Sequence, residues 1–242
     1  MARNVYVINV CDCFKKKLNR MVFNSSYFEP YYDDPKREKT YIDEIHWIEE
    51  SISLRDKDVL DYGCGIGRMM EKLKSFGANV YGCDVSEFAI RHCNSNGLRA
   101  RLIVQEDIPF DEKFDIIILR GVYQHLISPN VTISKLEKLI RPNGFIVILA
   151  TPNIESFCYR KLGILPTLSK DIVMNLPSRS SIRHSLEIHN FKVTKVAFPY
   201  WRSSYSRPAL DFLGFLMLIL KFKKGVPPAL PGNVIQVMGQ KC

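Results

Sequence analysis

The stretch Val59-Leu60-Asp61-Tyr62-Gly63-Cys64-Gly65-Ile66-Gly67-Arg68 decides the fold of this chain. An apolar run ends in an acidic residue, three glycines follow at alternate positions, and 69–74 has a helical pattern. A strand, a glycine turn and a helix start form a nucleotide-type site because glycine allows close backbone approach and the helix start offers unpaired N–H groups. A tight turn that binds nothing has the same glycines, so the neighbouring residues must decide.

Two details favour a cationic ligand. The glycines follow the spacing Gly-x-Gly-x-Gly instead of the Gly-x-Gly-x-x-Gly of dinucleotide-binding turns, and Asp61 precedes them. A pyrophosphate would be repelled by this carboxylate, whereas ammonium and sulfonium groups would be attracted. Asp84 ends the next apolar run 17 residues after Gly67, where a carboxylate can bind a ribose diol.

Apolar runs alternate with helical patterns along the chain. We expect strands at 58–60, 80–83, 101–104, 114–119, 145–150, 191–198 and 233–238. We expect helices at 36–52, 69–76, 87–94, 131–139 and 178–189, the first with an apolar stripe at Ile42, Ile45, Ile48 and Ile52. Such alternation indicates an α/β fold with a doubly wound parallel sheet, whose central strand is the uninterrupted apolar run 114–119.

Together these motifs resemble the class I S-adenosylmethionine-dependent methyltransferases, the small-molecule branch. The resemblance covers 41–241 and rests on the motifs at 59–67, 80–86, 114–119, 122–126, 139–145 and 151–153. It implies a Rossmann-like, doubly wound, seven-stranded and mostly parallel sheet with an antiparallel C-terminal edge hairpin. It also implies a methyltransferase domain over 41–242 after an N-terminal arm over 1–40, with insert or cap segments at about 154–177 and 199–232.

The resemblance implies S-adenosylmethionine as the cofactor. The cofactor-binding residues that it implies are Asp61, Gly63, Gly65, Gly67, Asp84, Val85, Glu106, Asp107 and Arg120. The backbone around Gly63 and Gly65 would hold the methionine portion. Asp61 would stabilise that loop and bind the ammonium group, directly or through water, and Asp84 would take both ribose hydroxyls.

The adenine end departs from the family pattern. Val85 would press on the adenine ring, but the usual Gly-Asp for the adenine amino group is replaced by Val-Gln-Glu-Asp-Ile-Pro at 104–109. Either Glu106 or Asp107 would accept that amino group. On the other side of the cofactor, the carbonyl of Arg120 would face the ammonium group, beside a glycine at 121.

Tyr123 and His125 follow the strand at 114–119, so the resemblance makes them the candidate catalytic and acceptor-contacting residues. His125 is a candidate general base for a hydroxyl acceptor because an imidazole titrates near neutral pH. A packing role against the cofactor or the loop is the alternative. No metal is expected, because the other histidines lack ligand spacing.

Charge is unevenly distributed over the 242 residues, whose net charge is +9. Residues 1–150 hold 21 Lys and Arg against 21 Asp and Glu, whereas 151–242 hold 13 against 4. A basic face attracts an anionic acceptor, a membrane surface or nucleic acid, or simply keeps the protein soluble. Seven scattered cysteines favour a reducing cytoplasm, and no signal peptide and no apolar run of ~20 residues is present.

Two segments lie outside the generic pattern. The aromatic segment 23–35 is expected to be an irregular arm over the ligand cleft or a partner surface, with Tyr27, Tyr31, Tyr32 or Tyr41 as residues that close over the cofactor or simply pack. The run 209–220 is apolar and is followed by lysines at 221, 223 and 224. Core packing, a homodimer contact through 209–224, a substrate lid and peripheral membrane contact all stay open for it.

The function that follows is O-methylation of a small-molecule or sugar- or glycan-linked acceptor, with N-methylation as the second choice. The basic C-terminal part would suit an anionic acceptor. The localisation that follows is cytoplasmic, with membrane association as an option. A non-catalytic S-adenosylmethionine-binding module and an NAD-dependent oxidoreductase are the alternatives, and Asp61 argues against the second. Nucleic acid is not a favoured substrate, because no Asn-Pro-Pro-Tyr type base-flipping motif occurs.

Overall fold

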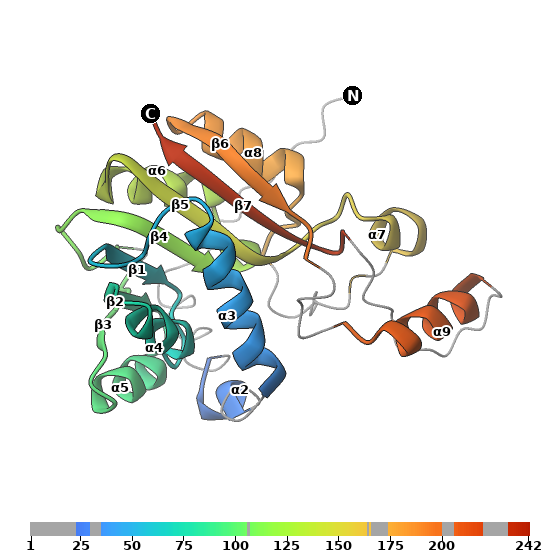
Figure 1. Ribbon diagram of the computed structural model, residues 1–242, viewed down its shortest axis with the longest axis horizontal. Coiled ribbons are helices and arrows are strands. Elements are labelled where there is room, and N and C mark those ends of the chain that lie inside the picture. The colour runs from blue at the N-terminus through green and yellow to red at the C-terminus, as the bar shows by residue number, and fades with distance from the viewer. Residues whose placement is uncertain are drawn as a thin grey trace.

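The structure is a computed structural model, and it describes residues 23–29, 35–105, 107–163, 165, 174–199, 206–219 and 232–242. One seven-stranded sheet organises this part of the chain, with the strand order β3-β2-β1-β4-β5-β7-β6 (Figure 1). The strands are β1 (Asp58–Tyr62), β2 (Asn79–Asp84), β3 (Arg99–Leu102), β4 (Phe114–Arg120), β5 (Ile140–Pro152), β6 (Phe191–Ala197) and β7 (Val234–Lys241).

Pairing within the sheet is parallel from β3 to β5 and antiparallel where β7 meets β5 and β6. The prediction of a doubly wound, mostly parallel sheet with an antiparallel hairpin at its C-terminal edge is therefore confirmed. At the centre, β4 is an apolar strand whose residues 116–119 are fully buried, as a strand covered on both faces requires.

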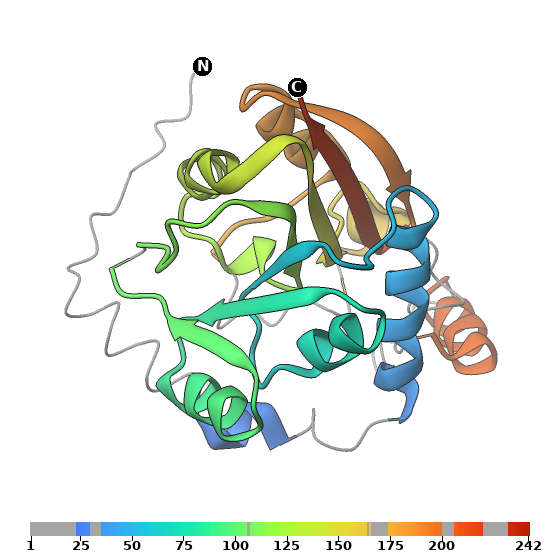
Figure 2. The same ribbon diagram turned by 60° about the vertical axis from the view of Figure 1, so that its left-hand side comes forward.

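Helices cover both faces of the sheet (Figures 1 and 2). One face packs against α3 (Pro35–Glu49), α4 (Arg68–Ser75) and α5 (Glu87–Ser95). The other packs against α6 (Pro129–Leu139), α8 (Arg179–Glu187) and the short 3-10 turn η2 (Tyr123–His125). The remaining helices are α2 (Ser25–Phe28), α7 (Phe157–Leu162) and α9 (Pro208–Ile219). Within the described ranges, every helix is too short or too polar to cross a bilayer.

Serine caps begin several of the helices where the sequence predicted a start. The Ser86 side chain accepts a hydrogen bond from Ala89 N at 3.2 Å, and Ser178 forms a capping box with Ser181. In α3, by contrast, the predicted stripe is rotated: Ile42 is exposed, and the buried face is formed by Tyr41, Glu44, Ile45 and Ile48. This rotation brings an acidic side chain into the interior.

Two strands differ most from the prediction in where they begin. β3 begins at Arg99, two residues earlier than expected, because it pairs with β2 from Tyr81 onward. β5 begins at Ile140 instead of 145, because Ile140 pairs with Phe114 before a register shift, and the Pro-Asn-Gly turn at 142–144 is thereby included in the strand.

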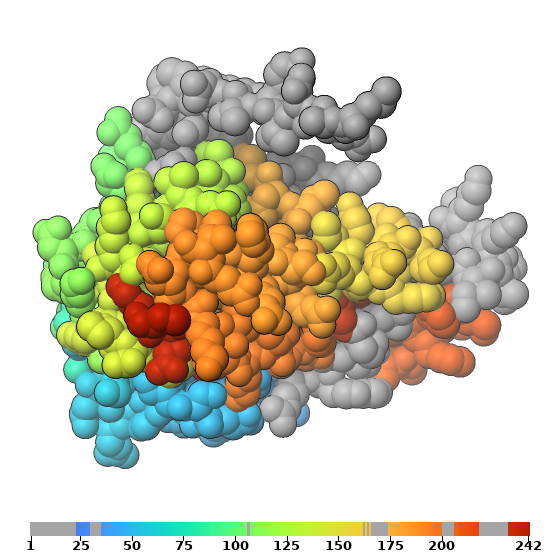
Figure 3. Space-filling model, turned by 90° about the horizontal axis from the view of Figure 1, so that it is seen from above, coloured from blue at the N-terminus to red at the C-terminus, as the bar shows by residue number. Residues whose placement is uncertain are grey.

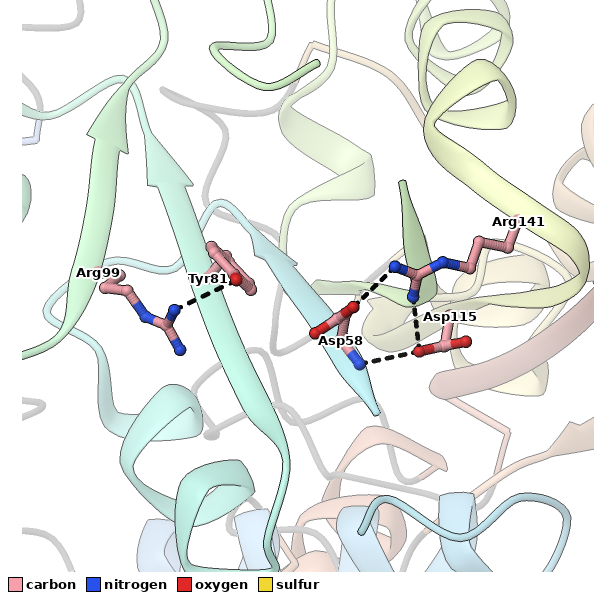
Figure 4. A network of polar contacts seen from close by, with 5 residues as sticks. All are labelled: Asp58, Tyr81, Arg99, Asp115 and Arg141. Carbon is pink, nitrogen blue, oxygen red and sulfur yellow. Dashed lines mark hydrogen bonds and ion pairs between the residues drawn. The ribbon is translucent and has the colours of Figure 1, made fainter. Parts of the chain in front are cut away.

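An ionic network holds the strand ends that lie opposite the glycine loop (Figure 4). The Arg141 guanidinium donates to Asp115 Oδ2 at 2.8 Å and to Asp58 Oδ2 at 2.7 Å, and Asp58 N donates to the same Asp115 oxygen at 2.9 Å. Nearby, Arg99 lies over the Tyr81 ring, 4.3 Å from its centroid. The network ties the starts of β1 and β4 to the beginning of β5.

Candidate cofactor and acceptor site

The loop after β1 is fixed by hydrogen bonds to the end of β2. Gly63 N and Cys64 N donate to the carbonyl of Cys83 at 2.7 and 3.0 Å, and Gly65 N donates to Asp84 Oδ2 at 2.9 Å. Gly63 and Gly67 have φ values of 77° and 86°. A Cβ at Gly63 would lie 2.3 Å from a Val122 methyl, and one at Gly67 would lie 2.4 Å from Leu98. These glycines are required by backbone conformation and by packing together.

Asp84 is buried at the carboxyl end of β2 and faces the glycine loop. Its Oδ1 accepts from Ser86 N at 2.8 Å and its Oδ2 accepts from Gly65 N at 2.9 Å. Burial raises the pKa of this carboxyl, and the backbone hydrogen bonds oppose that rise. Because an ionised carboxylate offers about four acceptor positions, Asp84 can bind the loop and still accept from hydroxyl groups.

Asp61 is the unusual group of the site. Its side chain is 1% exposed, and neither carboxylate oxygen has a hydrogen-bond partner among the described residues. Burial raises its pKa to about 7, Arg120 opposes the rise, and the charges of Asp84 and Glu44 add to it. A buried carboxylate without a partner is costly unless a ligand supplies one, and a cationic ligand is the partner that this site lacks.

A buried ion pair lies beside Asp61. Arg120, at the end of β4, donates from Nε to Glu44 Oε2 at 2.5 Å, and its guanidinium lies 4.3 Å from the centroid of the Tyr41 ring. Burial raises the pKa of Glu44, and Arg120 opposes this. Glu44 is not among the site residues that the sequence predicted. The signal was available, because 41, 44, 45 and 48 follow the helical spacing of one face.

His125 lies on η2, after β4, and is half-buried. Its Nε2 is 3.1 Å from the amide nitrogen of Gln124, which also donates to the carbonyl of Gly121 at 2.8 Å. An amide nitrogen only donates, so this imidazole nitrogen is the acceptor and the neutral ring carries its proton on Nδ1. Beside Gly121, whose φ is 65°, the space that a Cβ would occupy is open.

Tyr123 is placed differently from its prediction. The side chain is 3% exposed and lies in the core with α6 and α8. The structure therefore does not bring Tyr123 to the acceptor side of the site. In a 3-10 turn, successive side chains point in different directions, so two residues apart in sequence need not share a face.

The adenine end is described only in part. Asp107 is exposed, with a side chain 82% accessible, and pairs with Lys135 at 3.3 Å, so the structure does not bring it to the crevice. Glu106 lies outside the described residues. Val85 is partly buried and packs against the core that β4 shares with α6.

Residues 23–28, which lie within the segment predicted to be an arm, contact the glycine loop. Ser86 Oγ donates to the carbonyl of Phe23 at 2.6 Å, and Phe28 packs with Ile66 and lies against Gly65. The Phe23 ring is 6.3 Å from that of His125. Residues 23–28 thus reach from the loop to η2. Tyr31 and Tyr32 lie outside the described residues, and Tyr41 lies under Arg120.

A model of the methyltransferase domain family matches residues 34–196 of this chain. The chain belongs to the methyltransferase domain family. It is 28% identical over 178 residues to the ubiquinone biosynthesis O-methyltransferase of Coxiella burnetii, covering 70% of this chain and 71% of the relative. It is 32% identical over 163 residues to the protein of the same name from Dechloromonas aromatica, covering 63% of this chain and 67% of the relative.

Solved methyltransferase structures share the fold. Magnesium protoporphyrin IX methyltransferase from Synechocystis, with bound S-adenosylmethionine, superposes with a TM-score of 0.63 at 16% identity, covering 98% of this chain and 100% of that one. The chain is thus an S-adenosylmethionine-dependent methyltransferase with the predicted cofactor. Its residues fit this group, because the buried Asp61 carboxylate has no hydrogen-bond partner among the described residues and a positively charged ligand would supply one.

Proposed function

We propose that this methyltransferase transfers a methyl group to a hydroxyl oxygen of a small-molecule acceptor. The observation that supports this most is Asp61, a buried carboxylate that has no hydrogen-bond partner within the described ranges, next to Asp84 at the carboxyl edge of the sheet. The two relatives named above are O-methyltransferases by name, which favours oxygen over nitrogen as the methyl acceptor. A sugar- or glycan-linked acceptor remains within this proposal.

The proposed roles follow the geometry. Asp61 and the carbonyl of Arg120 bind the ammonium group, and the backbone of Gly63 and Gly65 holds the rest of the methionine portion, with Gly67 opening α4. Asp84 accepts from the ribose hydroxyls, and Val85 borders the adenine ring. When bound, S-adenosylmethionine supplies an activated methyl group, so the protein mainly positions the two reactants. We keep Glu106 as the proposed partner of the adenine amino group.

His125 is proposed to take the acceptor's hydroxyl proton on Nε2. Since that nitrogen now accepts from the Gln124 amide, the acceptor hydroxyl must replace the amide as hydrogen-bond donor. The neutral imidazole would then become an imidazolium as it takes the hydroxyl proton, and the bound cofactor would supply the methyl group to the acceptor oxygen and leave as S-adenosylhomocysteine. This role predicts that His125 acts in its neutral form.

We further propose one methyltransferase domain over 41–242, with 1–40 as an arm and with 154–177 and 199–232 as caps. Contacts of Asn175 support the first cap: its Nδ2 donates to the carbonyls of Tyr123 and Leu126 at 2.7 and 2.9 Å. The basic excess of 151–242 supports an anionic acceptor. Free buried cysteines, among them Cys64 and Cys93, support a cytoplasmic location.

The test is calorimetry with S-adenosylhomocysteine, followed by mass spectrometry of a panel of phenols and nucleotide-linked sugars incubated with S-adenosylmethionine. We expect S-adenosylhomocysteine to bind and one acceptor to gain a methyl group. His125→Ala should lose turnover but keep S-adenosylhomocysteine affinity, and Asp84→Ala should lose both. Binding without turnover on any acceptor would favour a non-catalytic module instead.

A further inference from the structure

The helix α9 exposes a large apolar surface. Its exposed side chains continue onto the start of α7, and the most accessible of them are Leu210 (60%), Phe212 (68%), Leu213 (51%), Leu216 (42%) and Phe157 (52%). Isolated exposed apolar residues are ordinary on soluble proteins, but a contiguous group of this size marks an interaction site. We call these five side chains the α7–α9 patch.

Contacts with α7 hold α9 in place. The ring of Phe215 lies 6.0 Å from that of Phe157, and Asp211 is buried while it accepts a hydrogen bond from Arg207 N at 2.7 Å. Figures 1 and 3 show the two helices together at one end of the molecule, away from the centre of the sheet. One side of α9 is therefore packed, and the patch is the side left uncovered.

The charges around the patch are positive. Arg160 and Lys161 are exposed on α7, and Arg207 is exposed immediately before α9. Glu155, which precedes α7, is paired with Arg179 at 3.9 Å. In the sequence, lysines at 221, 223 and 224 follow α9, within the half of the chain that carries the whole net charge. Apolar side chains flanked by cations match the acyl boundary and the phosphates of an anionic bilayer.

We propose that the α7–α9 patch docks on the surface of an anionic lipid bilayer. The apolar side chains enter the boundary below the headgroups, and the flanking arginine and lysine side chains meet the phosphates. A second copy of the chain is a poorer occupant. In a two-fold contact the patch meets itself, and the exposed cations at 160, 161 and 207 of the two copies then repel each other.

Docking in this way has a consequence for the acceptor. This consequence rests on the proposed function. The helix α7 begins five residues after β5 ends at Pro152, and η2 with His125 follows β4 at the same edge of the sheet. The acceptor side of the site then lies near the bilayer. An acceptor with an apolar tail reaches His125 from the membrane without first entering water.

Co-sedimentation tests the docking. The full chain is mixed with vesicles of phosphatidylcholine alone or with about one third phosphatidylglycerol, at low and high salt. We expect at least a tenfold stronger partition onto the anionic vesicles, which falls as salt rises. The pair of substitutions Phe212→Glu and Leu213→Glu should remove most of it, and Arg160→Glu should weaken it several-fold.

Two controls keep the test decisive. Ile188→Glu places one such charge on an exposed apolar residue at the C-terminal end of α8, with an exposure close to that of Leu213, and it should bind vesicles as the parent does. S-adenosylhomocysteine binding shows that each variant is folded, and it is independent of the vesicle result. The proposal is overturned if the parent does not pellet with anionic vesicles, or if Phe212→Glu with Leu213→Glu pellets like the parent. It is also overturned if those changes only dissociate a dimer.

Discussion

At the scale of single residues, Asp61 links the stability of the protein to its ligand. In the fold it keeps its proton up to about pH 7, whereas its reference pKa is 3.8. Folding therefore favours the protonated form, and the ligand-free protein loses stability as the pH rises from about 4 to about 7. A cationic ligand reverses the preference, because its ammonium group stabilises the ionised carboxylate.

Asp61→Asn should consequently act in opposite directions on stability and on binding. At about pH 8 the ligand-free variant should be more stable than the parent by up to about 4 kcal/mol, because folding raises the pKa of Asp61 from 3.8 to about 7 and an amide avoids this cost of ionising a buried group. Its affinity for S-adenosylhomocysteine should fall by at least about tenfold. Urea unfolding and calorimetry measure the two effects.

The pH dependence provides the control for Asp61. Affinity of the parent for S-adenosylhomocysteine should be constant above about pH 7 and should fall below it, approaching tenfold per pH unit, because the ligand must then displace a proton. The Asn variant should show a flat profile over the same range. Parallel profiles for parent and variant would show that Asp61 does not face the ligand.

At the scale of elements, η2 is positioned by a segment that is distant in sequence. Asn175 binds the carbonyls of Tyr123 and Leu126, and Gln124 O accepts from Met174 N at 2.9 Å. The turn that carries His125 is therefore held by two side-chain and two backbone hydrogen bonds from 174–175, in addition to its own hydrogen bonds.

Asn175→Ala should loosen η2 without disturbing the glycine loop. Loss of two hydrogen bonds to backbone carbonyls should cost about 1–2 kcal/mol of stability. Turnover should fall, because His125 is no longer fixed, while S-adenosylhomocysteine affinity stays within about twofold of the parent. Steady-state kinetics and calorimetry separate the two readouts, and equal losses in both would contradict the positioning role.

For the network around Arg141, at the other end of the strands, we predict an effect on stability and none on ligand affinity. Arg141→Ala removes both ion pairs, but the guanidinium is 39% exposed, so solvent screening limits the loss to about 1 kcal/mol. Affinity for S-adenosylhomocysteine should not change. A urea titration with parallel calorimetry checks this, and reduced affinity would mean that the two strand ends are coupled.

The elements themselves were largely predictable, because strand and helix patterns are local. The apolar run of β4, the glycine loop and the cap at Ser86 were all visible in the sequence. Features set by distant pairing were not. The extension of β5 to Ile140 depends on Phe114, and the Arg120–Glu44 ion pair joins residues 76 positions apart. The core position of Tyr123 likewise depends on α8.

At the scale of the whole molecule, the site lies where the order of the sheet reverses. The chain runs outward from β1 to β3 and then returns to place β4 on the other side of β1. The loops after β1 and β4 thus diverge, and the crevice between such loops is where ligands bind in open α/β sheets. Asp61, Asp84 and Arg120 come from three neighbouring strands, so a ligand there bridges both halves of the sheet.

S-adenosylhomocysteine should therefore stabilise the molecule as a single unit. At a concentration of about 100 times its dissociation constant it should add about 2.7 kcal/mol, equivalent to a shift in melting temperature of roughly 5–10 °C. Differential scanning calorimetry measures this shift. The transition should remain single with and without ligand, and a second transition unaffected by ligand would show an independently folding part.

The position of β7 has a consequence for synthesis. Although β7 follows every other strand in the chain, it lies inside the sheet, between β5 and β6. While the ribosome still holds Val234–Lys241, β6 has no neighbour to pair with and β5 exposes an open edge. Residues up to 241 must be synthesised before this side of the protein can assemble. A pause before that point would leave β6 unpaired and prone to aggregate.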